Sequence, residues 1–276
     1  MSQISAAAVN ELRKRTDLPL MECKKALTEA NGDLDKAIDI LRAGFGKAMS
    51  KREANETAEG RVTVKIAGDT AVIVELRCES APTAKNDLFG KLADDVAAAV
   101  IEHSPADVAA LTAIPAVKAR FEETVGLIRE KMVIHRFTRL TGGVFGYYVH
   151  HDLMSGALVQ CAGTAKADEL LRDIGAHVVA LNPTYFKADD IPADALAKEK
   201  AFIAQQIKDD PKNASKPANI IEKMSEGKLK TWMAESVLTE QPMANAAKYP
   251  NMTIAQALQK AGLTLTKVVR YKVGAG

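Results

Sequence analysis

The side chains that could carry covalent or metal chemistry are few and lie far apart in the sequence. The chain of 276 residues has five histidines and three cysteines. It contains none of the patterns GxxxxGK[ST], GxSxG, HExxH or CxxC, which would indicate a phosphate-binding loop, a nucleophile or a metal pair. We therefore expect no catalytic residues, no metal site and no cofactor. A binding protein is favoured over an enzyme with an unrecognised site.

Three histidines invite a ligand interpretation, and ordinary structural explanations compete with it. His150 and His151 are adjacent, and neighbouring side chains of a strand point to opposite faces, so this pair could not readily bind one metal ion. His177 lies among apolar residues at helical spacing, which favours a hydrogen-bonded structural histidine over a ligand. The cysteines are odd in number and far apart, which favours buried thiols in a reducing compartment over a disulfide.

Composition predicts a globular protein without a charge-driven partner. Hydrophobic residues make up 47% of the chain and charged residues 26%. The 37 basic and 35 acidic residues leave a net charge of +2, which argues against a protein that binds nucleic acid by phosphate neutralisation. No apolar run is long enough to span a membrane, and MSQISAAAVNELRKRTDL lacks a signal layout. We expect a cytoplasmic protein that contacts neither membranes nor nucleic acid directly.

The hydrophobic periodicity changes along the chain and divides it into four parts. Residues 1–45 show helical spacing in three short segments. Residues 46–59 are polar and unpatterned, as in a linker. Strand-like and helix-like runs both occur in residues 60–140, and both occur again in residues 141–276. Hairpins followed by helix pairs, twice over, predict an α+β core of two related halves.

Turn residues separate the elements that we expect within the core. Gly68-Asp69, Gly142-Gly143 and Ser155-Gly156 would be turns between strands. The expected strands are RVTVKIA, TAVIVELRC, VIHRFTRL, VFGYYVHHD, ALVQCAG and TLTKVVRYKV, and the expected helices are TAKNDLFGKLADDVAAAVIEH, AVKARFEETVGLIREKM and DELLRDIGAHVVAL.

A highly charged stretch, residues 190–230, interrupts the second half. Its apolar residues recur at helical spacing on either side of the turn sequence DDPKNASKPAN. This pattern predicts an antiparallel helical hairpin that projects from the core, with a flexible loop as the alternative. The face formed by Phe202, Ile203, Ile220 and Met224 would serve either packing within the hairpin or self-association.

One segment carries a specific family resemblance. RTDLPLMECKKALTEANGDLDKAIDILR, residues 15–42, closely resembles the N-terminal module of the bacterial elongation factor Ts family, with its T-D-x-P-x-M-x-C-K-K-A-L pattern and N-G-D turn. AEGRVTVKI, VELRCES, AKNDLF, GYYVHH and VVRYKVG also match in the same order, so the resemblance covers essentially the whole chain. It implies a three-helix, UBA-like domain, a two-part α+β core and a helical hairpin within the second part.

The resemblance implies a translation elongation factor that works without covalent chemistry. Members of this family are guanine-nucleotide exchange factors for the GTPase elongation factor Tu. They bind the nucleotide-free GTPase best, and linkage then requires that the factor weakens GDP binding by the same free energy. The alternative is a chaperone-like partner that holds elongation factor Tu with weak exchange activity. The assembly stays open, since relatives form homodimers, two-plus-two assemblies or one-to-one complexes.

In relatives, the residues that open the second N-terminal helix press on a helix of the GTPase. Here these residues are Leu20 and Met21, with Lys24 one turn further on the same face. Packing of Met21 inside its own bundle is an equal alternative. The charge of Lys24 fits an ionic contact better than that of Lys25, and a solvated face is the ordinary alternative for both.

Two further contact positions follow from family motifs. In the strand pattern G-x-Y-x-H, here Gly146, Tyr148 and His150, the family's histidine pushes against the region near the phosphate loop of the GTPase. The resemblance therefore assigns this role to His150. Ile128 matches another contact position. Arg129 follows it where many relatives have glycine, so we expect this neighbourhood to contact the partner differently.

The stretch RCESAPTAKNDLF departs from the family at its main contact. Relatives have C-Q-T-D-F-V-A-K, and their aspartate-phenylalanine pair disturbs Mg²⁺ binding by the GTPase. Ala81 and Pro82 stand in that register here, whereas Phe89 corresponds to a separate core aromatic. Pro82 suits a first helical turn and would hold Ala81 extended. Either the tip is rebuilt around Pro82 in a working exchange factor, or the protein binds its GTPase and exchanges poorly.

Overall fold

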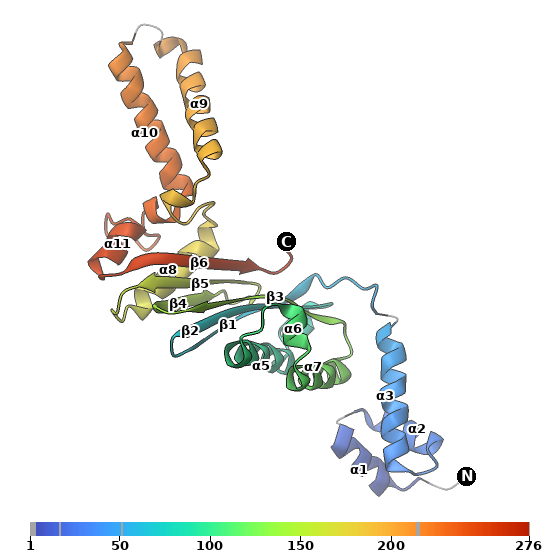
Figure 1. Ribbon diagram of the computed structural model, residues 1–276. Helices are drawn as coiled ribbons and strands as arrows, with labels where there is room; N and C mark the ends of the chain where they lie inside the picture. Colours follow the sequence, from blue (N-terminus) through green and yellow to red (C-terminus); the bar gives the residue numbers. More distant parts are fainter. Residues whose placement is uncertain (1–3, 17, 51, 214–215, 276) are drawn as a thin grey trace. The chain divides into compact units, whose positions relative to one another are not determined.

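Two small sheets and a set of helices make up the structure, a computed structural model drawn in Figure 1. The strands are ordered β1-β2-β3 in one sheet and β4-β5-β6 in the other, which confirms the predicted α+β class. The structure describes residues 4–16, 18–50, 52–213 and 216–275. The chain divides into two compact units, one with residues 1–63, 74–137 and 273–276 and one with residues 64–73 and 138–272.

Three helices form the N-terminal bundle, as the sequence predicts. They are α1 (Ala6–Thr16), α2 (Leu20–Glu29) and α3 (Leu34–Ser50). Leu12 and Leu27 are fully buried at its centre, and Asp33 caps α3 by accepting hydrogen bonds from two backbone N–H groups, each at 3.1 Å. α3 continues to Ser50, into the range expected to be a linker, because GKAMS supplies lysine, alanine and methionine, which favour helix.

The first half of the core follows the predicted order, with one interruption. The expected long helix from Thr83 is in fact two helices, because Asn86 caps a new one by accepting a hydrogen bond from Leu88 N–H at 2.8 Å. α5 and α7 pack against each other. The elements are β1 (Glu59–Ala67), β2 (Thr70–Cys78), α4 (Ala81–Ala84), α5 (Asp87–His103), α6 (Val108–Thr112), α7 (Pro115–Ile128) and β3 (Met132–Thr141).

The second half of the core is an antiparallel sheet with helix α8 packed on it. β4 pairs with β5 from Val144–Cys161 to Val149–Gly156, so Ser155 and Gly156 lie in β5 and do not form the expected turn. Leu171 and Ile174 of α8 are buried in the core of this unit. The elements are β4 (Val144–Val149), β5 (Ser155–Ala162), α8 (Asp168–Leu181), η1 (Ala188–Asp190), η3 (Leu238–Glu240), α11 (Ile254–Lys260) and β6 (Thr264–Lys272).

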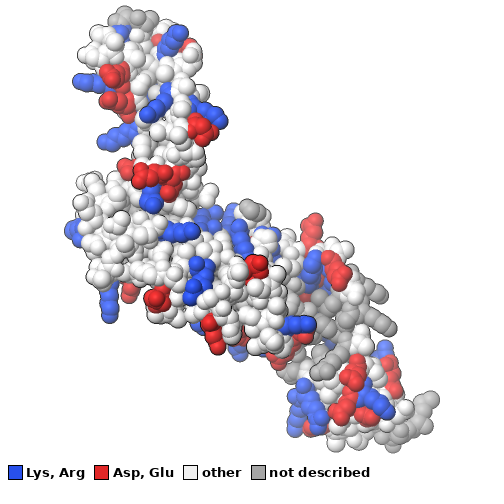
Figure 2. Space-filling view, viewed as in Figure 1, with Lys and Arg blue, Asp and Glu red and all other residues white. Residues whose placement is uncertain are grey.

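The charged stretch folds into the predicted hairpin, which projects from the second unit (Figure 1). It consists of α9 (Ala193–Asp209), the short η2 (Pro211–Asn213) and α10 (Ala218–Ser236). Ile203 is buried within the hairpin, whereas Phe202 is 58% exposed and Ile220 is 38% exposed. On the face seen in Figure 2, side chains of both charge signs occur along the hairpin. No helix in the described part of the chain is long and apolar enough to cross a membrane.

Candidate functional site

The tip between β2 and α5 is a one-turn helix that presents small residues to solvent. Ser80 caps α4 with extended dihedral angles (φ −129°, ψ 149°), and its hydroxyl accepts a hydrogen bond from Thr83 N–H at 3.4 Å. Ala81 and Pro82 are exposed, whereas Thr83 is buried. The expectation that Ala81 is extended is wrong, because Ala81 is helical. A residue before proline prefers an extended backbone, but the Ser80 cap and the helical hydrogen bond from Lys85 N–H to Ala81 O at 3.3 Å outweigh this preference.

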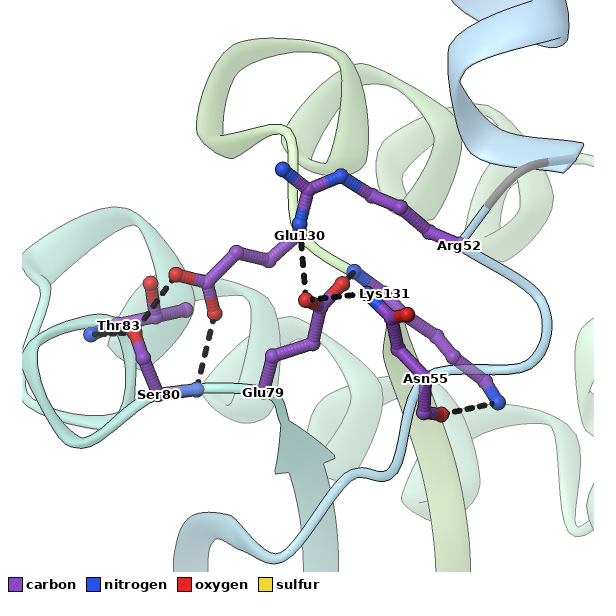
Figure 3. Close-up of polar contacts among 7 residues, drawn as sticks. All are labelled: Arg52, Asn55, Glu79, Ser80, Thr83, Glu130 and Lys131. Carbon is purple, nitrogen blue, oxygen red and sulfur yellow. Dashed lines mark hydrogen bonds and ion pairs between the residues drawn. The ribbon is translucent and has the colours of Figure 1, made fainter.

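Glu130 accepts two hydrogen bonds from Ser80, the residue that caps this tip (Figure 3). The backbone N–H of Ser80 donates to one carboxylate oxygen of Glu130 at 3.1 Å, and the Ser80 hydroxyl donates to the other oxygen at 2.6 Å. Both hydrogen bonds have a charged acceptor, which makes them stronger than bonds between neutral groups. Glu130 lies just after α7, so the end of that helix is tied directly to the beginning of α4.

Glu79 ties the base of the tip to the segment that precedes β1. Its carboxylate accepts hydrogen bonds from Lys131 N–H at 2.6 Å, Asn55 Nδ2 at 2.8 Å and Arg52 Nη1 at 2.8 Å. Lys131 in turn donates from Nζ to the carbonyl oxygens of Glu53 at 2.6 Å and Asn55 at 2.8 Å. Partial burial opposes ionisation of Glu79, but its donors outweigh this effect, and the pKa of Glu79 lies below its ordinary value.

The thiol and the aromatic ring near the tip both face inward. Phe89 is fully buried, as expected for a core aromatic. Cys78 Sγ donates to Ser80 O at 3.4 Å, and burial raises the pKa of the Cys78 thiol to about 12. Cys78 is therefore protonated at neutral pH and has no nucleophilic role.

The first turn of α2 presents an apolar pair and a lysine to solvent. Leu20 is 46% exposed and Met21 is 70% exposed, and Lys24 is exposed on the next turn. The opposite face of α2 carries Cys23 and Leu27, which are fully buried. The structure therefore rules out the alternative that Met21 packs inside its own bundle. This surface, defined by Leu20, Met21 and Lys24, is called the α2 face below.

His150 lies in a turn rather than in a strand. β4 ends at Val149, and Asp152 Oδ1 accepts a hydrogen bond from Met154 N–H at 2.8 Å, which closes the turn. The rings of His150 and His151 have centroids 4.2 Å apart, so the expectation that they point to opposite faces is wrong. His150 Nδ1 and the Tyr148 hydroxyl are hydrogen-bonded at 3.1 Å.

Gly146 of the G-x-Y-x-H pattern has a packing role. A Cβ atom at Gly146 would overlap with Leu171 of α8, and one at Gly175 would lie 3.0 Å from Tyr148 N. The two glycines let α8 lie close against β4, with Tyr148 and His150 further along the chain. Tyr147 is 44% exposed on the same strand, and the sequence pattern did not single it out.

Ile128 is the last residue of α7 and is half-buried. Arg129 follows it at the C-cap with φ +64°, in the left-handed region that favours glycine. This geometry explains why a glycine is suitable there. Of the contact positions expected from the sequence, His150 lies in the second unit. The others lie in the first unit, namely Leu20, Met21, Lys24, Ala81, Pro82 and Ile128.

The described residues show no group of three or more metal-ligating side chains. Cys23, Cys78 and Cys161 are free and buried. His177 is buried, its Nε2 hydrogen-bonds to Gln241 Oε1 at 2.8 Å, and its Nδ1 accepts from Ala244 N–H at 3.3 Å. His177 is thus a structural histidine, as expected, and burial lowers its pKa.

Comparison with known proteins decides the family. The profile of the family described as Elongation factor TS matches residues 83–275. Elongation factor Ts of Cupriavidus necator is 39% identical over 281 residues, which cover 100% of this chain and 92% of that protein. The chain belongs to the elongation factor Ts family. It is therefore a translation elongation factor.

Two further relatives show the same full-length similarity. Elongation factor Ts of Marinobacter nauticus is 40% identical over 278 residues, and that of Bordetella petrii is 38% identical over 283 residues. Each alignment covers 100% of this chain and 93% of the relative. The elongation factor Ts profile begins at Thr83, directly after Ala81 and Pro82.

Sequence reasoning missed Glu79 and Glu130, which organise the tip. The signal for Glu79 was weak, namely a carboxylate next to a potential capping serine after a strand. Glu130 is 50 positions from Ser80, and no local pattern connects residues so far apart.

Proposed function

We propose that this protein is a guanine-nucleotide exchange factor that binds elongation factor Tu in its GDP form and promotes GDP release by stabilising the nucleotide-free form. It would act in the cytoplasm as a binding protein and not as an enzyme. Membership of the elongation factor Ts family supports this proposal, and the surface residues described above supply the groups that such a factor needs.

The observation that carries the proposal is the exposure of the apolar pair on α2. A three-helix bundle has few apolar side chains, and the large ones normally lie inside. Leu20 and Met21 nevertheless remain 46% and 70% exposed. They are also the residues that the family resemblance assigns to a helix of the GTPase. Exposed apolar residues next to a lysine at this position are suited to an apolar and ionic contact with a partner helix.

The mechanism requires differential binding and no proton transfer. The α2 face would hold the GTPase, while the Ala81–Pro82 tip and His150 would press on the regions around Mg²⁺ and the phosphate loop. If these contacts form best with the nucleotide-free GTPase, they lower its affinity for GDP by the same free energy. GTP then binds the nucleotide-free GTPase and displaces the factor.

A holding partner with weak exchange activity is the second candidate function. The observation that favours it is the tip, where Ala81 and Pro82 offer much less surface than the phenylalanine of relatives. Full burial of one aromatic side chain contributes about 1.5–3 kcal/mol. Loss of all of it from the exchange transition state would slow exchange roughly ten- to hundredfold. Binding to elongation factor Tu would persist through the α2 face.

Stopped-flow release of fluorescent GDP from the cognate elongation factor Tu separates the two functions. We expect this protein to accelerate release, and Pro82→Ala to reduce that acceleration because the tip loses its fixed backbone. Tight binding without acceleration would establish the holding function instead. An unchanged rate of GDP release with Pro82→Ala would show that the tip has no role in exchange.

The stoichiometry of the complex is a separate part of the proposal. Phe202 and Ile220 are exposed on the hairpin and offer an apolar surface for a homodimer or a two-plus-two assembly. Light scattering of the purified complex distinguishes such assemblies from a one-to-one complex by mass.

A further inference from the structure

The tip cannot fix its own orientation. α4 has four residues, Ala81–Ala84, and a single helical turn is unstable without outside support because nucleation of a helix costs more than one turn regains. Ala81 and Pro82 are exposed, so packing does not hold them on their outer side. Thr83 and Ala84 are buried and hold the second half of the turn. The direction of Ala81 and Pro82, in its first half, therefore depends on what holds Ser80, the residue that caps the turn.

Hydrogen bonds to Glu130 and Thr83 hold Ser80 in place. Its N–H and hydroxyl both donate to Glu130, at 3.1 Å and 2.6 Å, and its hydroxyl also accepts from Thr83 N–H at 3.4 Å. The Ser80 hydroxyl thus joins Glu130 to the first turn of α4 in one continuous network (Figure 3). A carboxylate with two donors from one residue fixes that residue's direction as well as its distance.

The neighbouring carboxylate fixes the base of the same network. Glu79 binds the backbone N–H of Lys131 at 2.6 Å, and Lys131 follows Glu130 directly. The consecutive pairs Glu79-Ser80 and Glu130-Lys131 are therefore joined by hydrogen bonds in both directions. We call these four residues the tip brace.

We propose that Glu130 is a positioning residue for nucleotide exchange, which holds Ala81 and Pro82 through Ser80 in the direction needed to act on the GTPase. The proposal rests on the proposed exchange function. Glu130 itself need not touch the partner. Its carboxylate holds the tip in one direction before binding, so the tip loses less conformational entropy when it contacts the GTPase. This saving in free energy partly offsets the small apolar area of Ala81 and Pro82.

The first test compares Glu130→Ala with the wild-type protein in GDP release from elongation factor Tu, over a range of exchange-factor concentrations. A misplaced tip lowers the release rate at saturation, whereas the concentration for half-maximal effect stays set by the α2 face. Loss of two hydrogen bonds to a charged acceptor is expected to reduce the saturating rate roughly tenfold. Glu122→Ala is the matched control, since Glu122 is exposed on α7 and pairs only weakly with Lys118 at 4.0 Å.

A second set of variants keeps the test decisive if Glu130→Ala folds poorly. Ser80→Ala removes only the hydroxyl and should lower the saturating exchange rate. Ser80→Thr retains a hydroxyl and should keep a rate close to that of the wild type. Combining Ser80→Ala with Glu130→Ala should cost little more than Glu130→Ala alone, because both remove the same hydrogen-bond network. Circular dichroism at the assay temperature confirms that each variant is folded.

The outcomes separate this proposal from the exchange function on which it rests. A wild-type protein that gives no acceleration overturns both. A wild-type protein that accelerates release, together with folded Glu130→Ala and Ser80→Ala variants of unchanged saturating rate, overturns the positioning role alone. A change confined to the half-maximal concentration also overturns it, because Glu130 would then contribute to affinity and not to the direction of the tip.

Discussion

Replacing Met21 by alanine tests the α2 face most directly. Met21 is 70% exposed, and a methionine of that exposure contributes little to the stability of its own bundle. If the α2 face binds elongation factor Tu, the same side chain becomes buried in the complex. Met21→Ala is therefore expected to weaken binding and to leave folding almost unchanged.

The size of the effect follows from the exposed fraction. Full burial of a methionine side chain contributes about 1.5–3 kcal/mol. Because 70% of Met21 is open to solvent, covering this exposed part at an interface would contribute about 1–2 kcal/mol. This free energy corresponds to a roughly five- to thirtyfold higher Kd for nucleotide-free elongation factor Tu. The thermal unfolding midpoint should move by no more than about 2 °C.

Isothermal titration calorimetry with nucleotide-free elongation factor Tu measures the binding change, and circular dichroism measures unfolding. Leu181→Ala is the matched control, since Leu181 is 55% exposed at the end of α8 and belongs to no proposed contact. Its Kd should equal that of the wild type. An unchanged Kd for Met21→Ala would refute the assignment of α2 as a partner surface. Equal weakening by both variants would refute its specificity.

Three further outcomes are expected. Lys24→Ala should weaken binding of elongation factor Tu and reduce its salt dependence more than Lys25→Ala, which calorimetry at two ionic strengths measures. The stabilising effect of neutral His177 is present above its ordinary pKa of 6.5 and is lost as pH falls below it, because burial lowers the folded-state pKa. Thermal unfolding at several pH values should show this loss in the wild type and not in His177→Gln. Gly146→Ala should destabilise the fold by about 1–3 kcal/mol because its Cβ would overlap with α8. Gly227→Ala, with open space around the new Cβ, should be neutral or stabilising by up to about 1 kcal/mol. Urea titration of the two variants and the wild type measures both changes.

Local patterns were sufficient for the N-terminal bundle and for most of the core. The NGD turn places its left-handed residues, Asn31 at φ +53° and Gly32 at φ +91°, where short polar and glycine residues tolerate them. Asp33 then caps α3. Each of these signals acts within a few residues, so the sequence alone could predict them.

Competing local signals explain the errors near the candidate site. Ser80 and Asn86 are both good capping residues, and the structure uses both, so the expected single helix becomes two. After β4, Asp152 and the pair Ser155-Gly156 all favour a turn, and the hydrogen bond from Met154 N–H to Asp152 selects the earlier position. The sequence offers these alternatives with similar strength, and only the sheet register decides between them.

The tip brace could not have been predicted from the sequence, and it changes how the tip departure is interpreted. Judged by residue type, Ala81-Pro82 has less apolar area and one charge fewer than the aspartate-phenylalanine pair that the family resemblance implies for this position. Judged by structure, the same tip has a proline in its first turn and a cap fixed by Glu130 at two points. Area and rigidity both contribute to binding, since a rigid contact avoids the roughly 0.5–1.5 kcal/mol that ordering a mobile side chain costs.

This comparison limits what rigidity alone can supply. A rigid tip avoids at most the roughly 0.5–1.5 kcal/mol that ordering one mobile side chain costs, against the about 1.5–3 kcal/mol that burial of an aromatic contributes. A tip that works by direction alone should therefore exchange somewhat more slowly than a tip with the aromatic. Introducing phenylalanine by Pro82→Phe adds area and removes the proline constraint together. If the saturating exchange rate of Pro82→Phe rises, the apolar area of the tip limits exchange. If this rate falls, the direction set by Pro82 and Glu130 limits exchange.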